Sequence, residues 1–102
     1  MNNELRKGIH FDLDTEILKG EYKGSDWHNA YYDIRRFFEK NDFVHIQGTG
    51  YHSKRPMEEG QAMIVVYAMG RAFKWIKKSM RICTIADIPE IYDITKAFGE
   101  EG

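Results

Sequence analysis

The alternation of apolar and polar residues predicts where strands and helices lie along the chain. From Gly8 to Asp14 the two kinds of side chain alternate, which predicts a strand. One face of that strand carries Ile9, Phe11 and Leu13, and the other carries His10, Asp12 and Asp14. Further along, apolar residues recur at helical spacing, which predicts a helix from Ser25, its candidate N-cap, to about Lys40.

Turn-forming residues delimit the remaining elements. Between the first strand and that helix, Asp14 is a candidate N-cap for a short helical turn, and Gly20 is expected to end it. A hairpin is predicted next, and its segments are a strand at 43–47, a bend at 48–50 and a return strand at 51–53.

The second half of the chain contains one long apolar segment and one further strand. We predict a helix from Met57 to about Lys74, because its acidic start and basic end suit the helix macrodipole, although residues 64–67 have strand propensity. A strand from Arg81 to Ile88 is stopped by Pro89, and a short helix is predicted from Glu90 to Phe98.

This order of elements predicts an α+β, ferredoxin-like βαββαβ fold with an additional C-terminal helix. Its helices are expected on one face of a mostly antiparallel sheet. We expect a single domain over residues 8–98, with flexible segments at 1–7 and 99–102. The same fold serves many unrelated functions, so it does not decide the activity.

Composition restricts the setting of the protein. A chain of 102 residues, 42% of them hydrophobic, forms one domain with a modest core, which pairing with a second copy would help stabilise. Cys83 has no cysteine partner, which points to a reducing compartment. Neither a signal region nor a membrane span is recognisable, so we expect a cytoplasmic protein without membrane contact.

Charge is segregated although the net charge is only −1. Residues 54–81 hold seven basic and two acidic residues, whereas residues 82–102 hold one basic and five acidic residues. Within the basic segment, five cations lie in eleven residues around Trp75: Arg71, Lys74, Lys77, Lys78 and Arg81. Phosphate contacts together with aromatic stacking would suit single-stranded RNA, whereas the alternative is a solvated helix face with Trp75 in the core.

Several short segments, taken in order and spacing, match a known family. They are Phe11-Asp12-Leu13, residues 16–22, residues 29–35, residues 43–48 with Tyr51, and residues 75–81. Over residues 8–98 the chain resembles virulence-associated protein D, a family of ferredoxin-like endoribonucleases related to the small nuclease-fold subunit of CRISPR spacer acquisition. The resemblance implies a homodimer that cleaves RNA, often in a toxin–antitoxin setting with an antitoxin protein as partner.

The resemblance also implies site residues and shows departures from the family pattern. Asp12 and Leu18 match positions of the family's site, and Thr49 stands where the family's hairpin commonly has a serine, which offers the same hydroxyl group. Gly50 stands where the family's hairpin continues with a larger residue. Ile82 stands where an acidic residue is expected, unless Asp87 substitutes for it.

The chemistry of Asp12 can be considered on its own. Two Asp12 carboxylates brought together across a two-fold axis would repel each other, so one would gain a proton or the pair would recruit a cation such as Mg²⁺. Either outcome suits cleavage of an RNA phosphodiester. His10 and Asp14 lie on the same face as Asp12, and the three side chains together could form a metal site. The alternatives are that Asp14 caps the following helix and that Asp12 is an ordinary solvent-facing strand residue.

The remaining polar candidates leave alternatives open. Thr49 can bind a phosphate or satisfy the backbone of its own turn. His28, His45 and His52 are scattered, and no pattern selects one as a general acid. We therefore expect an endoribonuclease acting on single-stranded RNA, with the toxin role as an extension. The alternative is a catalytically weak or inactive dimer that binds nucleic acid or protein.

Overall fold

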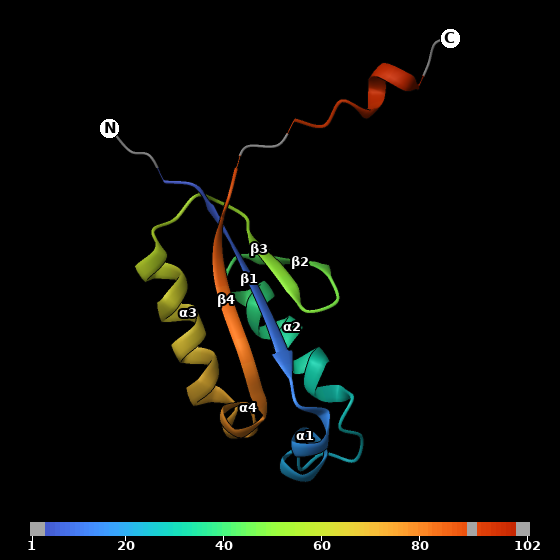
Figure 1. The fold of residues 1–102 in the computed structure, drawn as a ribbon, viewed down its shortest axis with the longest axis vertical. Coiled ribbons are helices and arrows are strands. Elements are labelled where there is room, and N and C mark those ends of the chain that lie inside the picture. The colour runs from blue at the N-terminus through green and yellow to red at the C-terminus, as the bar shows by residue number, and fades with distance from the viewer. Residues whose placement is uncertain (1–3, 90–91, 100–102) are drawn as a thin grey trace.

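The computed structural model describes residues 4–89 and 92–99. Its elements along the chain are β1 (Arg6–Leu13), α1 (Thr15–Glu21), α2 (Asn29–Lys40), β2 (Phe43–Gln47), β3 (Gly50–Ser53), α3 (Glu59–Ala72), α4 (Lys74–Ser79), β4 (Met80–Ile88) and a 3₁₀ turn (Thr95–Phe98) (Figure 1). The helix predicted over residues 64–67 is confirmed, as are the bounds of β2.

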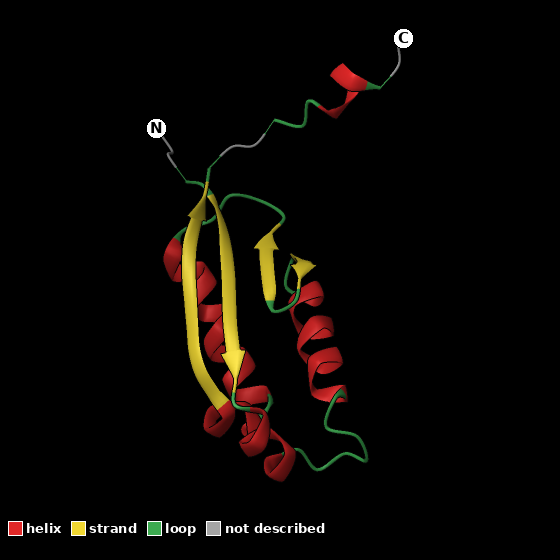
Figure 2. Ribbon diagram, turned by 45° about the vertical axis from the view of Figure 1, so that its right-hand side comes forward, coloured by secondary structure: helices red, strands yellow, loops and turns green. Residues whose placement is uncertain are grey.

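The four strands form one sheet in the order β2-β3-β1-β4, and every neighbouring pair is antiparallel. The helices gather on one side of this sheet, and the other side carries no helix of the described chain (Figure 2). This arrangement is the predicted ferredoxin-like α+β fold. β1 lies in the interior of the sheet, where β3 and β4 pair with its two edges.

The alternation along β1 separates the core from the open face. Ile9, Phe11 and Leu13 are buried against the helices, whereas His10 and Asp12 are exposed on the opposite side. Behind the sheet the core is completed by aromatic and aliphatic side chains, which include Phe38, Phe43, Ile34, Leu18, Tyr51 and Met69. Phe38 stacks on Tyr51 with ring centroids 4.3 Å apart.

Helix boundaries differ from prediction where capping groups outweigh composition. The Asp14 carboxylate accepts hydrogen bonds from two backbone N–H groups at the start of α1, as its cap role predicts. The helix nevertheless continues through Gly20 and ends at Glu21, so the predicted glycine stop is wrong. α2 begins at Asn29, four residues beyond the predicted cap at Ser25.

The long helix predicted from residue 57 to residue 74 is divided in two. α3 begins only after Glu58, whose side chain and backbone form a reciprocal capping box with Gln61. Phe73 is extended, with φ −125° and ψ 98°, and this separates α3 from the short α4. The break turns α4 toward α1, which it contacts at one end of the molecule (Figure 1).

Both ends of the domain differ from expectation. The sheet begins at Arg6 rather than Gly8, because Lys7 is buried, donates its backbone N–H to the Ser53 hydroxyl and pairs with Asp87 at 2.7 Å. The expected flexible segment 1–7 is therefore wrong for these strand residues. The C-terminal helix is reduced to a single 3₁₀ turn after residue 94.

Some sequence-based expectations lie outside the described residues. These are the start of the C-terminal helix at residues 90–91 and the outer ends of the two flexible segments, residues 1–3 and 100–102. Within the described ranges, no helix has the length and apolar character needed to cross a membrane.

Candidate functional site

Asp12 lies near the end of β1 on the open face of the sheet. Its side chain is 62% exposed, and the Arg81 Nε atom is 3.8 Å from one carboxylate oxygen. The residue opposite Asp12 on β4 is Ile82, and the register shifts between Asp12 and Leu13. Ile82 occupies the position at which the family pattern has a second acid. Asp12 therefore faces an aliphatic side chain there.

Asp87 does not replace that acid. It lies five residues further along β4, roughly 16 Å at strand spacing, and its carboxylate pairs with the buried Lys7. The possibility that Asp87 substitutes for the missing acid, which the sequence left open, is therefore not supported within one protomer.

The three-residue metal site proposed around Asp12 is also not formed. The Asp14 carboxylate is bound to the backbone N–H groups of Glu16 and Ile17 at 3.0 and 3.1 Å. Across the described ranges, no group of three histidine, cysteine, aspartate or glutamate side chains is placed to hold a metal ion. Within one protomer, Asp12 contributes a single carboxylate.

Thr49 lies on the β2–β3 turn beside the end of β1. Its hydroxyl donates to the Phe11 carbonyl at 2.5 Å, and its own carbonyl accepts from the Phe11 N–H at 3.3 Å. The turn has this shape because Gly48 adopts a φ of 54°, a left-handed conformation that glycine adopts without steric cost. Thr49 therefore fastens the turn to the residue preceding Asp12.

A cavity of about 540 Å³ opens between this turn and α2, and we call it the hairpin pocket. Its lining residues come from β1, the start of α2 and the hairpin: Phe11, His28, Tyr31, Tyr32, Arg35, His45, Gly48, Thr49 and Tyr51. The volume falls in the range of pockets that hold small ligands. One arginine, two imidazoles and several aromatic rings thus share a pocket with Thr49.

Hydrogen bonds orient the two imidazoles in this pocket. The His28 Nδ1 atom is 2.7 Å from an Asp26 carboxylate oxygen, which leaves Nε2 as its other nitrogen. The His28 ring also stacks on Trp27, with centroids 3.9 Å apart. His45 Nε2 lies 2.7 Å from the Gly48 carbonyl, so this nitrogen carries the proton.

Electrostatics link the hairpin pocket to Asp12. Burial raises the pKa of the Tyr31 hydroxyl, and the negative charge of Asp12 raises it further. Burial also raises the pKa of Tyr51 to about 12, so this phenol stays protonated at neutral pH. Asp12 therefore acts electrostatically on a residue that lines the pocket.

Leu18 occupies a different environment from the other two predicted site residues. Its side chain is completely buried in the core, within α1. An aliphatic side chain has no group that transfers protons or binds phosphate, so the structure places Leu18 in packing rather than in contact with a substrate.

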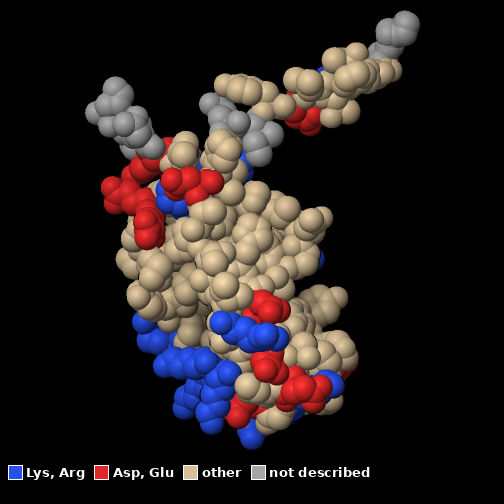
Figure 3. Space-filling view, viewed as in Figure 1, with Lys and Arg blue, Asp and Glu red and all other residues tan. Residues whose placement is uncertain are grey.

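The predicted basic cluster lies around α4, at the end of the molecule where Figure 3 shows blue side chains gathered. Two of its members lie near acids: Lys78 is 3.7 Å from Glu21, and Arg81 is near Asp12. For the other three, Arg71, Lys74 and Lys77, no ion pair is found within the described part of the chain.

Trp75 does not present a free stacking surface within this cluster. Its ring is partly buried and lies between Phe73 and Tyr22, with centroids 5.1 and 5.3 Å away. The alternative of Trp75 as a core anchor is therefore the correct one.

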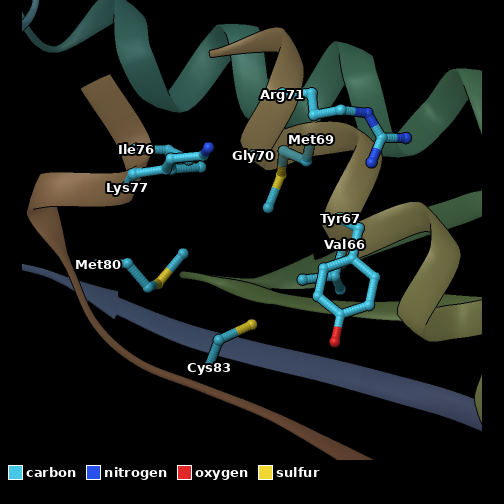
Figure 4. Close-up of a pocket in the computed structure, with 9 residues that line it drawn as sticks. All are labelled: Val66, Tyr67, Met69, Gly70, Arg71, Ile76, Lys77, Met80 and Cys83. Carbon is cyan, nitrogen blue, oxygen red and sulfur yellow. The ribbon is translucent and has the colours of Figure 1, made fainter. Parts of the chain in front are cut away.

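A second cavity of about 340 Å³ lies between α3, α4 and β4, and we call it the sulfur pocket (Figure 4). Its lining is mostly apolar and contains three sulfur-bearing side chains, Met69, Met80 and Cys83. Two cations of the basic cluster, Arg71 and Lys77, also line it.

Some pocket residues were not selected from the sequence. His28, Tyr31, Tyr32 and Arg35 follow one another at spacings of three, four and seven from the first, which places them on one side of a helix start. That spacing could have shown from the sequence that the four residues share one face of a helix. The sequence could not show that the β2–β3 turn lies over that face of α2 and so forms a pocket.

The amino-acid sequence can be compared with those of known proteins. No protein-family profile matches the chain. The chain is 27% identical over 89 residues to Endoribonuclease VapD 2 of Riemerella anatipestifer, which covers 87% of this chain and 95% of that protein. The chain is therefore similar to this VapD relative over most of the length of both proteins. The alignment with this VapD relative spans most of the domain.

Proposed function

We propose that the protein is an endoribonuclease that cleaves single-stranded RNA. The relative named as an endoribonuclease supports the reaction class. The observation that carries the proposal is the hairpin pocket, which combines Arg35, His28 and Thr49 and adjoins the strand end that bears Asp12. A guanidinium binds phosphate, and an imidazole transfers protons near neutral pH.

The proposed reaction uses the 2′-hydroxyl of RNA as the nucleophile. Asp12 accepts the proton of that hydroxyl, and the oxygen attacks the adjacent phosphorus to form a 2′,3′-cyclic phosphate. The bond from phosphorus to the 5′-oxygen breaks, and this oxygen takes a proton from His28, whose Nδ1 atom lies 2.7 Å from an Asp26 carboxylate oxygen. Arg35 binds the phosphate oxygens, and Thr49 holds the turn against β1.

Mg²⁺ would contribute by neutralising charge on the phosphate. A single carboxylate together with RNA phosphate oxygens is a common way for proteins to bind this ion. Asp12 would contribute that carboxylate, and the Arg81 Nε atom lies 3.8 Å from it.

We further propose that two copies pair through the open face of the sheet. Two aliphatic residues on that face are about half exposed, Ile82 at 56% and Ile46 at 47%. Pairing through this face would cover them and bring the two Asp12 side chains closer together. The toxin role, with an antitoxin as partner, is a proposal that rests on the family resemblance alone.

The test is cleavage of a labelled single-stranded RNA by the wild-type protein, with Mg²⁺ and with EDTA. Asp12→Asn and His28→Gln are each expected to lower the cleavage rate at least about a hundredfold, as loss of a proton-transfer group does. Asp42→Asn is the matched control. It removes a carboxylate that pairs with Arg55 and keeps a residue type that tolerates the φ of 66° at this position.

A binding dimer without catalysis is the second candidate, and Ile82 opposite Asp12 is the observation that favours it. In that case wild-type protein binds RNA but leaves it intact in both Mg²⁺ and EDTA. Equal cleavage by wild-type and Asp12→Asn protein would instead exclude Asp12 from the reaction.

A further inference from the structure

The sulfur pocket has a lining that suits a flat aromatic group. Met69, Met80 and Cys83 point their sulfur atoms into it, and Tyr67 forms one wall (Figure 4). Thioether sulfur makes favourable contacts with aromatic rings and adapts to their shape. The volume of about 340 Å³ is at the lower end for ligand pockets, which fits one planar group better than an extended ligand.

The border of the pocket carries positive charge. Arg71 comes from the last turn of α3 and Lys77 from α4, so the two cations approach from different helices. Lys74 and Lys78 lie three residues before and one after Lys77 on α4, which extends the charge beyond the pocket. An occupant with an aromatic ring and flanking negative charges would satisfy both the lining and the border.

We propose that the sulfur pocket binds one nucleobase of single-stranded RNA, with the adjoining phosphates on Arg71 and Lys77. The inference rests on the proposed function, because it assigns a substrate subsite to the same RNA. It also explains why an apolar cavity lies within a basic surface, an arrangement that phosphate contacts alone do not need.

The acidic C-terminal segment of the same chain is less well placed to fill this pocket. β4 starts at Met80, beside the pocket, and runs eight further residues to Ile88 before the chain continues away from the domain. Figure 1 shows the C-terminal segment at the end of the molecule opposite α4. Its apolar side chains, Tyr92, Ile94 and Phe98, are 75%, 66% and 85% exposed.

The experiment separates base recognition from charge by comparing two polyanions. Binding of an oligouridylate and of inorganic polyphosphate with a matched number of charges is measured at raised salt, on the Asp12→Asn protein so that RNA stays intact. The oligouridylate is expected to bind about tenfold more tightly, the size of one base-stacking contribution. Val66→Phe fills the pocket and is expected to remove that preference while polyphosphate binding stays unchanged.

Ile64→Phe is the matched control, because Ile64 is 64% exposed on the same helix and does not line the pocket. Tyr67→Ala is the second variant in case Val66→Phe does not fold. Tyr67 is 59% exposed, so removal of its ring leaves the core intact. Tyr67→Ala is expected to weaken oligouridylate binding while polyphosphate binding stays unchanged.

Three results would overturn the inference. Equal affinity for the two polyanions would mean that charge alone binds RNA. Unchanged oligouridylate preference in Tyr67→Ala and Val66→Phe would place the base elsewhere. A change in oligomeric state in these variants, with RNA affinity intact, would assign the pocket to a protein contact such as the C-terminal segment of a second copy. Failure of RNA cleavage with retained base preference would contradict only the proposed function.

Discussion

Replacement of Phe38 by alanine is expected to remove a large share of the folding free energy. Phe38 has no exposed surface, stacks on Tyr51 and contacts Phe43 at a centroid distance of 5.4 Å. Truncation of a buried phenylalanine costs about 3–5 kcal/mol, because apolar burial is lost and a cavity remains. A domain of this length has a total stability of about 5–15 kcal/mol.

The measurement is urea unfolding followed by fluorescence and circular dichroism. For a urea dependence of about 1–2 kcal/mol per molar, the Phe38→Ala midpoint is expected to fall by about 1.5–5 M. If that variant does not fold, Phe38→Leu retains most of the volume and is expected to cost about 1–2 kcal/mol. Midpoints are taken at several protein concentrations, since a dimer makes them concentration-dependent.

Phe98→Ala is the control, with the same change at a side chain that is 85% exposed. It is expected to alter stability by less than about 0.5 kcal/mol. A Phe38→Ala loss below about 1 kcal/mol would refute the assignment of Phe38 to the core. A Phe98→Ala loss as large as that of Phe38→Ala would show that Phe98 is covered in solution.

Three further perturbations have directions that follow from the structure. Gly48→Ala is expected to cost about 1 kcal/mol in thermal unfolding, because φ is 54° and no atom obstructs a Cβ, whereas Gly48→Asn is expected to cost less. Asp14→Ala is expected to cost about 1 kcal/mol in the same assay through loss of the α1 cap, with Asp14→Asn close to wild type. Burial, then the charges of Arg6 and His10, lowers the pKa of His52 below 6.5, so the unfolded chain binds that proton more readily. Stability is therefore expected to fall as the pH drops from about 6.5 through the lowered pKa of His52. His52→Gln is expected to flatten this part of the plot of urea midpoint against pH. Equal slopes for the wild-type and His52→Gln proteins would contradict this prediction.

The strands and the sheet face were predictable because a two-residue period directly reports which side of a strand is buried. Ile9 and Phe11 behave as that period predicts, and Asp12 lies on the opposite face as expected. Helix ends were less predictable, because they depend on side chains that compete for the same N–H groups. The Glu58–Gln61 capping box and the extended Phe73 illustrate this.

The site was predictable only in part, since a pocket is a property of several elements at once. Thr49 was selected and does line the hairpin pocket, but its hydroxyl is engaged with the Phe11 carbonyl. Arg35 and His28 were not selected, because only the position of the β2–β3 turn over α2 gives them a common cavity. Lys7 was assigned to a frayed end because its sequence neighbours are polar, and its partner Asp87 lies eighty residues away.

The pairing of β1 with β4 has a consequence for when the protein acquires its fold. The register joins Arg6 to Ile88 and Phe11 to Cys83, so the second edge of β1 is covered only by residues that lie far later in the sequence. Contacts between such distant residues slow folding, since a long loop closes before they form. During synthesis, a ribosome-bound chain that has not yet released residues 80–88 has β1 with an open edge and lacks Arg81 beside Asp12. Whatever activity depends on this end of the sheet therefore begins only after residues 80–88 have been synthesised and have paired with β1.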